Sequence, residues 1–120
     1  MNSGDGSVSF CGVKLVPPLS TNLAKMQVLT PTGIQAAAIS PLTMGCSAIL
    51  HAETGSGKTL AYLVPLLKRL YENGQLNQTP RQALILVPTK ELAVQVAAEI
   101  TALLSEDMEA LDTSCVSLCI

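Results

Sequence analysis

The pattern of apolar and polar residues divides the chain into alternating helical and extended segments. Leu19, Leu23 and Met26 recur at helical spacing after Pro17-Pro18, which predicts a first helix there. Further helices are predicted at residues 34–43, 58–71 and 91–104, and the first of these is expected to end near Gly45. Pro65 lies inside the helix predicted at 58–71. A proline costs about 3 kcal/mol there unless packing compensates, so we expect a kink or an early stop.

Short apolar runs between these helices predict buried strands. Residues 47–52 contain Ala48-Ile49-Leu50, and residues 83–87 are apolar throughout. Residues 113–120 alternate at a period of two and predict a third strand. Strands separated by helices form βαβ units, whose strands are parallel and whose crossovers are right-handed. The fold class is therefore expected to be α/β, with ligands bound beyond the carboxyl ends of the strands.

The composition agrees with this fold class and limits what the chain can bind. Of 120 residues, 48% are hydrophobic but only 2% are aromatic, so the core must be aliphatic, as in parallel sheets covered by helices. The net charge of −2 argues against nucleic-acid binding through bulk charge, so any such contact needs a local site. No apolar run reaches the length of about 18 residues typical of a membrane span. Residues 1–9 lack the basic and apolar regions of a signal peptide.

The cysteines give an expectation for the compartment. They form no C-x-x-C pair and have no histidine cluster near them, so a zinc site is not predicted. These residues are Cys11, Cys46, Cys115 and Cys119. We interpret them as buried, reduced thiols of an intracellular protein, in the cytoplasm or nucleus, with an organelle as an alternative.

The strongest motif is the run Ala52-Glu53-Thr54-Gly55-Ser56-Gly57-Lys58-Thr59. It matches the P-loop pattern, except that Ala52 stands where the first glycine usually does. Gly55 and Gly57 let backbone N–H groups close around a polyphosphate, and the helix that follows points its positive end at the same place. Lys58 supplies a charge for the β- and γ-phosphates, and the Thr59 hydroxyl suits Mg²⁺. We therefore expect this run to bind nucleotide, with Lys58 and Thr59 as the catalytic residues and Thr59 as the metal ligand.

A plainer interpretation of the same run is a glycine-rich turn at a helix start with a solvated lysine. The context of a strand before the run and a helix after it favours the P-loop. His51, beside the run, is expected to be a packed or hydrogen-bonded histidine, because it has no nucleophile partner in the sequence.

Three segments in this order resemble motifs of the DEAD-box helicase family. Residues 52–59 have the form of motif I, and Pro88-Thr89-Lys90-Glu91-Leu92-Ala93 resembles motif Ia, with Lys90 where the family more often has arginine. Pro31-Thr32-Gly33-Ile34-Gln35 resembles the Q motif, and Phe10 stands where the isolated upstream aromatic of the family falls. Val28 and Gly33 depart from the family pattern, which leaves the local backbone there in doubt.

This resemblance implies a P-loop NTPase (RecA-like) fold of three layers, α/β/α, with a parallel sheet that is incomplete here. Residues 1–9 would be a flexible N-terminus, 10–36 a Q-motif region and 37–120 a truncated helicase ATP-binding domain. The resemblance also implies ATP and Mg²⁺ as cofactors. Gln35 would read the adenine edge and Phe10 would stack on its face. Pro88, Thr89 and Lys90 would lie on the RNA backbone without reading its sequence.

Several of these residues have a structural alternative. Thr32 and Gln35 have the spacing of a capping box, so Gln35 could simply cap a helix. Phe10 could be a core residue. Thr89 could be a helix N-cap with Lys90 in solvent, and Glu91 suits the first turn of a helix, where it complements the dipole.

The sequence contains no acidic residue at the end of an apolar strand to hold Mg²⁺ for hydrolysis. The Asp-Glu-Ala-Asp and Ser-Ala-Thr motifs of the family and its second lobe are also absent. We expect the ATP-binding portion of an ATP-dependent RNA helicase, which couples ATP binding and hydrolysis to RNA remodelling. These 120 residues by themselves are expected to bind ATP weakly or not at all and to be inactive and poorly soluble. The alternatives are a non-catalytic ATP- or RNA-binding module or short isoform, and another P-loop NTPase such as a DNA helicase.

Overall fold

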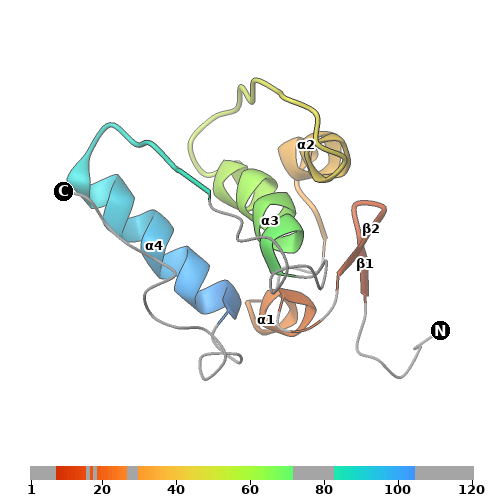
Figure 1. Cartoon of the computed structure of the whole chain (residues 1–120). Coiled ribbons are helices and arrows are strands. Elements are labelled where there is room, and N and C mark those ends of the chain that lie inside the picture. Colours follow the sequence, from red (N-terminus) through yellow and green to blue (C-terminus); the bar gives the residue numbers. More distant parts are fainter. Residues whose placement is uncertain (1–7, 16, 18, 27–29, 72–82, 105–120) are drawn as a thin grey trace.

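The computed structural model describes residues 8–15, 17, 19–26, 30–71 and 83–104. In these ranges a short hairpin precedes four helices (Figure 1). The elements are β1 (Val8–Phe10), β2 (Val13–Leu15), α1 (Leu19–Lys25), α2 (Gly33–Thr43), α3 (Lys58–Tyr71) and α4 (Lys90–Leu104). Helix α3 lies in the middle, with α2 and the hairpin on one side, α4 on the other and α1 across one end (Figure 1).

The hairpin was not predicted from the sequence. Strands β1 and β2 pair antiparallel, with Val8 opposite Leu15 and Phe10 opposite Val13. The two turn residues, Cys11 and Gly12, both have positive φ angles, of 54° and 77°. Positive φ at both central positions is typical of a type I′ turn, whose twist matches that of the paired strands.

All four predicted helices are present, with ends within a residue or two of the predicted ones. The expected end of α2 near Gly45 is confirmed, since Gly45 has a φ of 94° just beyond the helix. The early stop expected at Pro65 is wrong, because α3 continues through it to Tyr71. Pro65 is fully buried, so its packing offsets the lost backbone hydrogen bond.

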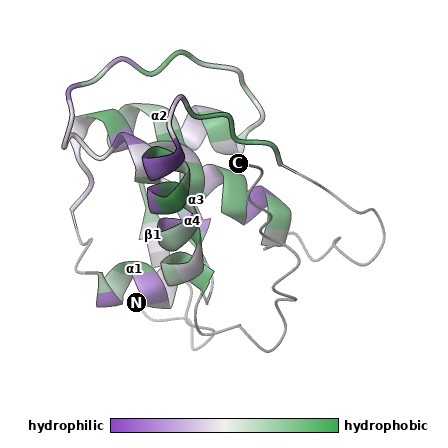
Figure 2. Cartoon of the chain, turned by 90° about the vertical axis from the view of Figure 1, so that its left-hand side faces the viewer, coloured by the Kyte–Doolittle hydropathy of each residue, from purple (hydrophilic) through white to green (hydrophobic). Residues whose placement is uncertain are grey.

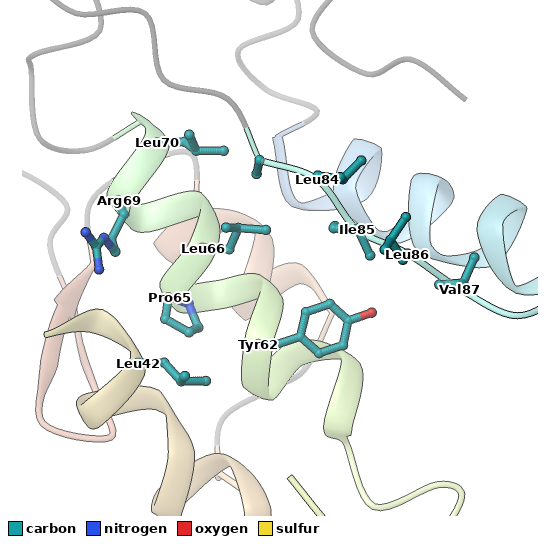
Figure 3. A pocket seen from close by; sticks show the side chains of 11 residues that line it. Leu42, Tyr62, Pro65, Leu66, Arg69, Leu70, Leu84, Ile85, Leu86 and Val87 are labelled. Atoms are coloured by element: carbon teal, nitrogen blue, oxygen red, sulfur yellow. The ribbon is translucent and has the colours of Figure 1, made fainter. Parts of the chain in front are cut away.

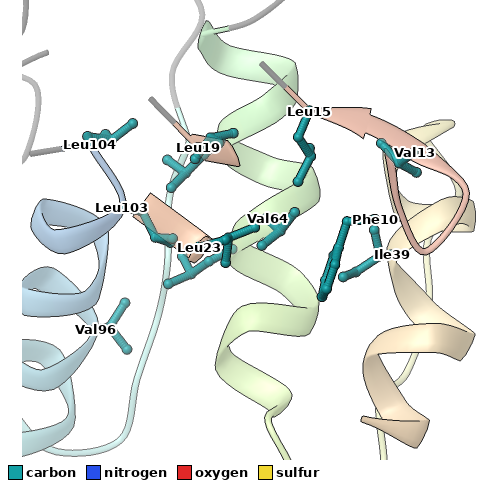
Figure 4. Close-up of a cluster of buried hydrophobic side chains, with 12 residues drawn as sticks. Phe10, Val13, Leu15, Leu19, Leu23, Ile39, Val64, Val96, Leu103 and Leu104 are labelled. Atoms are coloured by element: carbon teal, nitrogen blue, oxygen red, sulfur yellow. The ribbon is translucent and has the colours of Figure 1, made fainter. Parts of the chain in front are cut away.

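Helix α3 supplies the centre of the core. Leu63, Val64 and Leu67 on this helix are buried, and side chains from the hairpin, α1, α2 and α4 pack around them (Figure 4). The surrounding buried residues are Phe10, Val13, Leu15, Leu19, Leu23, Ile39, Val96, Leu103 and Leu104. Asn22 of α1 is also buried, and its Nδ2 donates a hydrogen bond to the backbone carbonyl of Leu103. The N-terminal segment and α4 are thereby tied together at the end of α4 that lies farthest from residues 88–90.

The predicted strands at residues 47–52 and 83–87 are not formed in this structure. Among the described residues the hairpin is the only sheet, and the strand predicted at 113–120 lies outside them. Ile49 is 97% exposed. A strand needs a neighbour for its backbone N–H and C=O groups, and neither segment has one here. The parallel sheet therefore stays a prediction.

Residues 83–87 nevertheless keep the alternation of a strand. Ile85 and Val87 pack against the core, whereas Leu84 and Leu86 are 84% and 83% exposed. The segment runs as one continuous hydrophobic stretch outside the helices (Figure 2). Apolar residues on both sides are typical of a strand buried on both faces.

A cavity of about 810 Å³ lies between α3 and residues 83–87 (Figure 3). Its walls are mainly apolar, from Leu42, Pro65, Leu66 and Leu70 on one side and the extended segment on the other. Tyr62 is the only lining residue within the first two turns of α3, which adjoin the loop 52–59. We therefore assign the cavity to incomplete packing and not to a ligand. Within the described ranges, none of the helices is both long and apolar enough to cross a bilayer.

Candidate nucleotide-binding site

The run 52–59 forms a loop that leads directly into α3. Gly55 and Gly57 have φ angles of 82° and 87°, a backbone conformation that side chains with a Cβ rarely adopt. The Ser56 N–H donates to the Glu53 carbonyl at 3.1 Å, which closes the turn. The backbone conformation at both positions therefore favours glycine.

The N-terminus of α3 faces this loop with unpaired backbone donors. The first helical hydrogen bond runs from the Ala61 N–H to the Gly57 carbonyl at 3.1 Å. The N–H groups of Lys58, Thr59 and Leu60 therefore have no acceptor within the helix. Together with the helix dipole they present partial positive charge to the loop, which is the arrangement that binds phosphate.

The loop residues fit a polyphosphate. The Ser56 Oγ atom is buried and has no hydrogen-bond partner among the described residues, so a polar group is oriented inward without its acceptor or donor. A Cβ built on Gly55 would meet no atom within 4 Å, so the loop is open on that side. Lys58 and Thr59 are half-buried beside it.

The residues also fit Mg²⁺ held jointly with phosphate. No group of three His, Cys, Asp or Glu side chains within the described ranges could hold a metal by itself. Mg²⁺ usually keeps several waters and takes only one or two protein ligands besides the phosphates of its nucleotide. The Thr59 hydroxyl is sufficient for that role, whereas a protein-only metal site is not formed here.

Gln35 connects the Q-motif segment to the loop. Its backbone N–H donates to Thr32 Oγ1 at 3.4 Å, and its Oε1 accepts from the Thr32 N–H at 3.0 Å, so the capping box is confirmed. In addition, Gln35 Nε2 donates to the Gly57 carbonyl at 3.2 Å. The side chain is 2% exposed. The sequence spacing predicted the cap, but the bond across 22 positions to Gly57 was not visible in it.

Phe10 occupies the core and not an open surface. Its ring is 7% exposed and lies beside Val13 and Ile39 (Figure 4). The core interpretation of Phe10 is confirmed by this burial. A stacking role on adenine would require the ring to leave that packing.

Residues 88–90 form the start of α4. The Leu92 N–H donates to Thr89 Oγ1 at 3.1 Å, and the Ala93 N–H donates to the Thr89 carbonyl at 3.1 Å. Thr89 is therefore the N-cap of α4, as the structural alternative predicted. Pro88, Thr89 and Lys90 are all exposed, and Glu91 stands in the first turn of the helix. An exposed helix start with a lysine is compatible with phosphate contacts.

Tyr62 is a residue near the site that the sequence analysis did not select. It stands one turn after Thr59 on α3, and its side chain is half-buried. Burial and, to a lesser degree, the Glu99 carboxylate of α4 raise the pKa of Tyr62, and the nearby Thr59 side chain acts in the opposite direction. The i, i+3 spacing of Thr59 and Tyr62 was a signal that could have suggested this pair.

The cysteines do not all match the expectation. Cys46 is exposed and Cys11 is half-buried, so the prediction of buried thiols is wrong for Cys46. Burial raises the pKa of the Cys11 thiol, which keeps it protonated and less reactive. Both are free thiols, and the other two cysteines lie outside the described residues.

Comparison with known proteins identifies the family. Residues 32–117 match the family model described as DEAD/DEAH box helicase. The chain belongs to this family. The residues of this chain that match the helicase model include Gln35, the loop 52–59 and residues 88–90. Phe10 lies before the matched range. Membership implies a RecA-like P-loop fold, of which the described residues show the helices.

Curated relatives of this helicase-family chain carry RNA helicase names. The chain is 43% identical over 95 residues to the ATP-dependent rRNA helicase RRP3 of Lodderomyces elongisporus, covering 79% of this chain and 18% of that protein. It is 41% identical over 99 residues to the probable ATP-dependent RNA helicase DDX28 of Mus musculus, covering 80% and 18%. It is 37% identical over 101 residues to the ATP-dependent RNA helicase DBP8 of Phaeosphaeria nodorum, covering 84% and 19%. The chain spans less than a fifth of the length of each of these relatives.

Proposed function

We propose that this chain is the ATP-binding portion of an ATP-dependent RNA helicase, which couples ATP binding and hydrolysis to RNA remodelling. The observation that supports this most strongly is the loop 52–59 at the start of α3. It contains two positive-φ glycines and a buried Ser56 hydroxyl without a partner among the described residues, and it leads directly into the first turn of the helix. A glycine-rich loop that leads into a helix N-terminus suits the polyphosphate of a nucleotide.

In this proposal Lys58 neutralises charge on the β- and γ-phosphates, and Thr59 contributes its hydroxyl to Mg²⁺. When bound, the ion would supply positive charge to the phosphates. Backbone N–H groups from 54–59 supply the rest of the phosphate contacts. Residues 52–59 are thus the proposed nucleotide-binding residues. Lys58 and Thr59 are the proposed catalytic residues among them, because they act on the phosphates and on Mg²⁺.

Gln35 has the hydrogen-bonding capacity to read adenine. Its Oε1 accepts one bond and its Nε2 donates one, so one lone pair and one N–H remain. Adenine offers a donor at N6 and an acceptor at N7, which matches that remainder, whereas guanine offers two acceptors. Since Gln35 is buried, the base would have to approach from the side of the loop. Phe10 would stack on adenine only after leaving the core.

Residues 88–90 are proposed to contact the RNA backbone. The exposed Lys90 and the N-terminus of α4 suit a phosphate, and such contacts position the RNA without specifying its sequence. The net charge of −2 is compatible with this only because the contact is local.

The RecA-like core of this proposal requires a parallel sheet in three α/β/α layers. Residues 47–52 and 83–87 would be two of its strands, since their exposed apolar side chains lack partners in the present structure. Residues 1–9, 10–36 and 37–120 remain the proposed N-terminal, Q-motif and ATP-binding regions. Hydrolysis needs an acidic Mg²⁺-binding motif and a second lobe, neither of which these residues contain, so this chain is proposed to bind ATP weakly without turning it over.

Phosphorus NMR of ATP titrated with the chain tests the proposal, because it detects weak binding. We expect the β- and γ-phosphate resonances to shift with the wild-type chain and not with Lys58→Ala. Lys25→Ala, which removes a lysine from the end of α1, is the matched control for loss of charge and should behave as wild type. Unchanged ATP binding by Lys58→Ala would overturn the assignment of the loop. GTP binding as tight as that of ATP would overturn the adenine role of Gln35 alone.

A further inference from the structure

The Gln35 side chain makes one contact that neither helix capping nor base recognition requires. Capping of α2 uses its backbone N–H and its Oε1 atom, which both pair with Thr32. Recognition of adenine would use the remaining lone pair of Oε1 and one N–H of Nε2. The other hydrogen of Nε2 is donated at 3.2 Å to the Gly57 carbonyl, which lies 22 positions further along the chain.

The Gly57 carbonyl stands where the loop becomes a helix. It accepts the first hydrogen bond of α3, from the Ala61 N–H at 3.1 Å, so Gly57 occupies the N-cap position. Its φ angle of 87° belongs to a region that glycine enters and leaves at little steric cost. The direction of the carbonyl therefore depends on the groups that donate to it, and Gln35 is one of only two such donors among the described residues.

The direction of this carbonyl also sets the direction of the Lys58 N–H. The peptide bond between Gly57 and Lys58 is planar and trans, so its C=O and its N–H point in opposite directions. Because the carbonyl is directed along α3 toward Ala61, the Lys58 N–H points out of the start of the helix. A phosphate at a helix N-terminus accepts hydrogen bonds from N–H groups that point in this way.

The Gln35 amide is held firmly enough to act as a restraint. Its side chain is 2% exposed, and its Oε1 accepts from the Thr32 N–H at 3.0 Å, which fixes the orientation of the amide. The contact with the loop is close, since a Cβ on Gly57 would lie 2.5 Å from Nε2. Helix α2 lies beside α3 (Figure 1), so the amide ties the first peptide of α3 to a neighbouring helix.

We propose that Gln35 is a positioning residue for the phosphates: its bond to the Gly57 carbonyl holds the peptide between Gly57 and Lys58 so that the Lys58 N–H faces a bound polyphosphate. This inference rests on the proposed nucleotide site and deepens it. Its consequence is that Gln35 contributes to the binding of a polyphosphate that carries no base. A residue that only reads adenine would contribute nothing to such a ligand.

Inorganic tripolyphosphate tests this consequence, because it has the phosphate chain of ATP without the adenosine. Its binding to the full chain is measured by phosphorus NMR in EDTA, so that no metal takes part. Gln35→Met keeps the length of the side chain and removes the amide, and it should weaken tripolyphosphate binding by about two- to tenfold, the worth of one hydrogen bond. Gln95→Met makes the same exchange at an exposed position of α4 and should bind as the wild type.

A second control separates positioning from capping. Thr32→Ala removes the acceptor of the Gln35 backbone N–H and leaves the bond from Nε2 to Gly57 in place. It should lower the midpoint of urea unfolding, as the loss of a cap does, and keep the tripolyphosphate affinity of the wild type. Should Gln35→Met fail to fold, Gln35→Asn gives the same comparison, because its amide is one methylene too short to reach Gly57.

Three results would overturn the inference while leaving the proposed function intact. The first is an unchanged tripolyphosphate affinity in the Gln35 variants with weaker ATP binding, which is the result for a residue that only reads the base. The second is an equal loss of tripolyphosphate affinity in Thr32→Ala, which is the result for a residue that only caps α2. The third is binding of ATP but not of tripolyphosphate by the wild type. Absence of any ATP binding by the wild type would overturn the proposed nucleotide site and this inference with it.

Discussion

Replacing Gly57 by alanine tests the junction between Gln35 and the phosphate loop. A Cβ at Gly57 would lie 2.5 Å from Gln35 Nε2, 3.0 Å from Thr32 Oγ1 and 3.3 Å from Gln35 Cδ. The residue also has a φ of 87°. Two separate costs therefore act on the Gly57→Ala variant, and Gly55 offers a way to separate them.

Each cost can be estimated. A residue with a Cβ in the left-handed region costs about 1–2 kcal/mol. Displacing the Gln35 amide breaks its bond to the Gly57 carbonyl and leaves a buried polar group unpaired, which costs about 1–3 kcal/mol. Gly57→Ala should thus lower the free energy of unfolding by about 2–5 kcal/mol. Gly55 has a φ of 82°, and a Cβ there would meet no atom within 4 Å. Gly55→Ala should therefore incur only the cost of the left-handed backbone conformation.

Urea unfolding followed by circular dichroism at the helix band measures both variants. The midpoint for Gly57→Ala should lie below that for Gly55→Ala by roughly 1 M urea, given slopes of about 1–3 kcal/mol per molar for small proteins. Combining Gly57→Ala with Gln35→Ala removes the clashing side chain, so the second substitution should cost less in that background than in the wild type. Equal midpoints for the two glycine variants, or strict additivity of the pair, would refute the contact between Gln35 and Gly57.

Three further predictions concern stability and solubility. Asn22→Ala leaves the Leu103 carbonyl without its donor and should cost about 1–3 kcal/mol in urea unfolding; an unchanged midpoint would contradict the bond. Thr89→Ala removes the N-cap of α4 and should cost about 0.5–2 kcal/mol, whereas Thr89→Ser should recover most of it, and equal losses would argue against capping. Leu84→Ser with Leu86→Ser should raise the solubility limit and change stability by less than about 0.5 kcal/mol, measured by sedimentation and unfolding; a large loss would mean that these side chains are buried in solution.

The helices could be predicted because their signals are local. The apolar spacing on α1 and the breaker at Gly45 lie within a few residues of the structure that they determine. The effect of Pro65 was misjudged because burial of that residue is a tertiary property that spacing does not contain.

Strands were harder to predict because a strand needs a neighbouring strand to accept and donate its backbone hydrogen bonds. The apolar run at 83–87 shows which side chains avoid water but not which segment would pair with it, and no partner lies beside it among the described residues. The hairpin at 8–15 was missed for a different reason. Its turn uses Cys11 in a left-handed conformation, where a glycine or asparagine is the usual signal.

The site shows the same division between local and long-range information. The capping box at Gln35 and the N-cap at Thr89 follow from short motifs, and the sequence offered both as structural alternatives. The hydrogen bond from Gln35 to Gly57 joins two motifs that lie 22 positions apart, so neither motif predicts it. The burial of Phe10 depends on tertiary packing, which its position in the sequence does not determine.

The proposed phosphate loop is continuous with α3, the helix at the centre of the core that the described residues form. Anything that loosens the packing of α3 therefore disturbs the first turn that would hold ATP, and anything that clamps that turn firms the packing behind it. A bound nucleotide would therefore stabilise the folded form of this chain. Each tenfold excess of ATP over its dissociation constant would add about 1.4 kcal/mol in favour of the folded form. The fraction of this chain that is folded would then rise with the concentration of ATP.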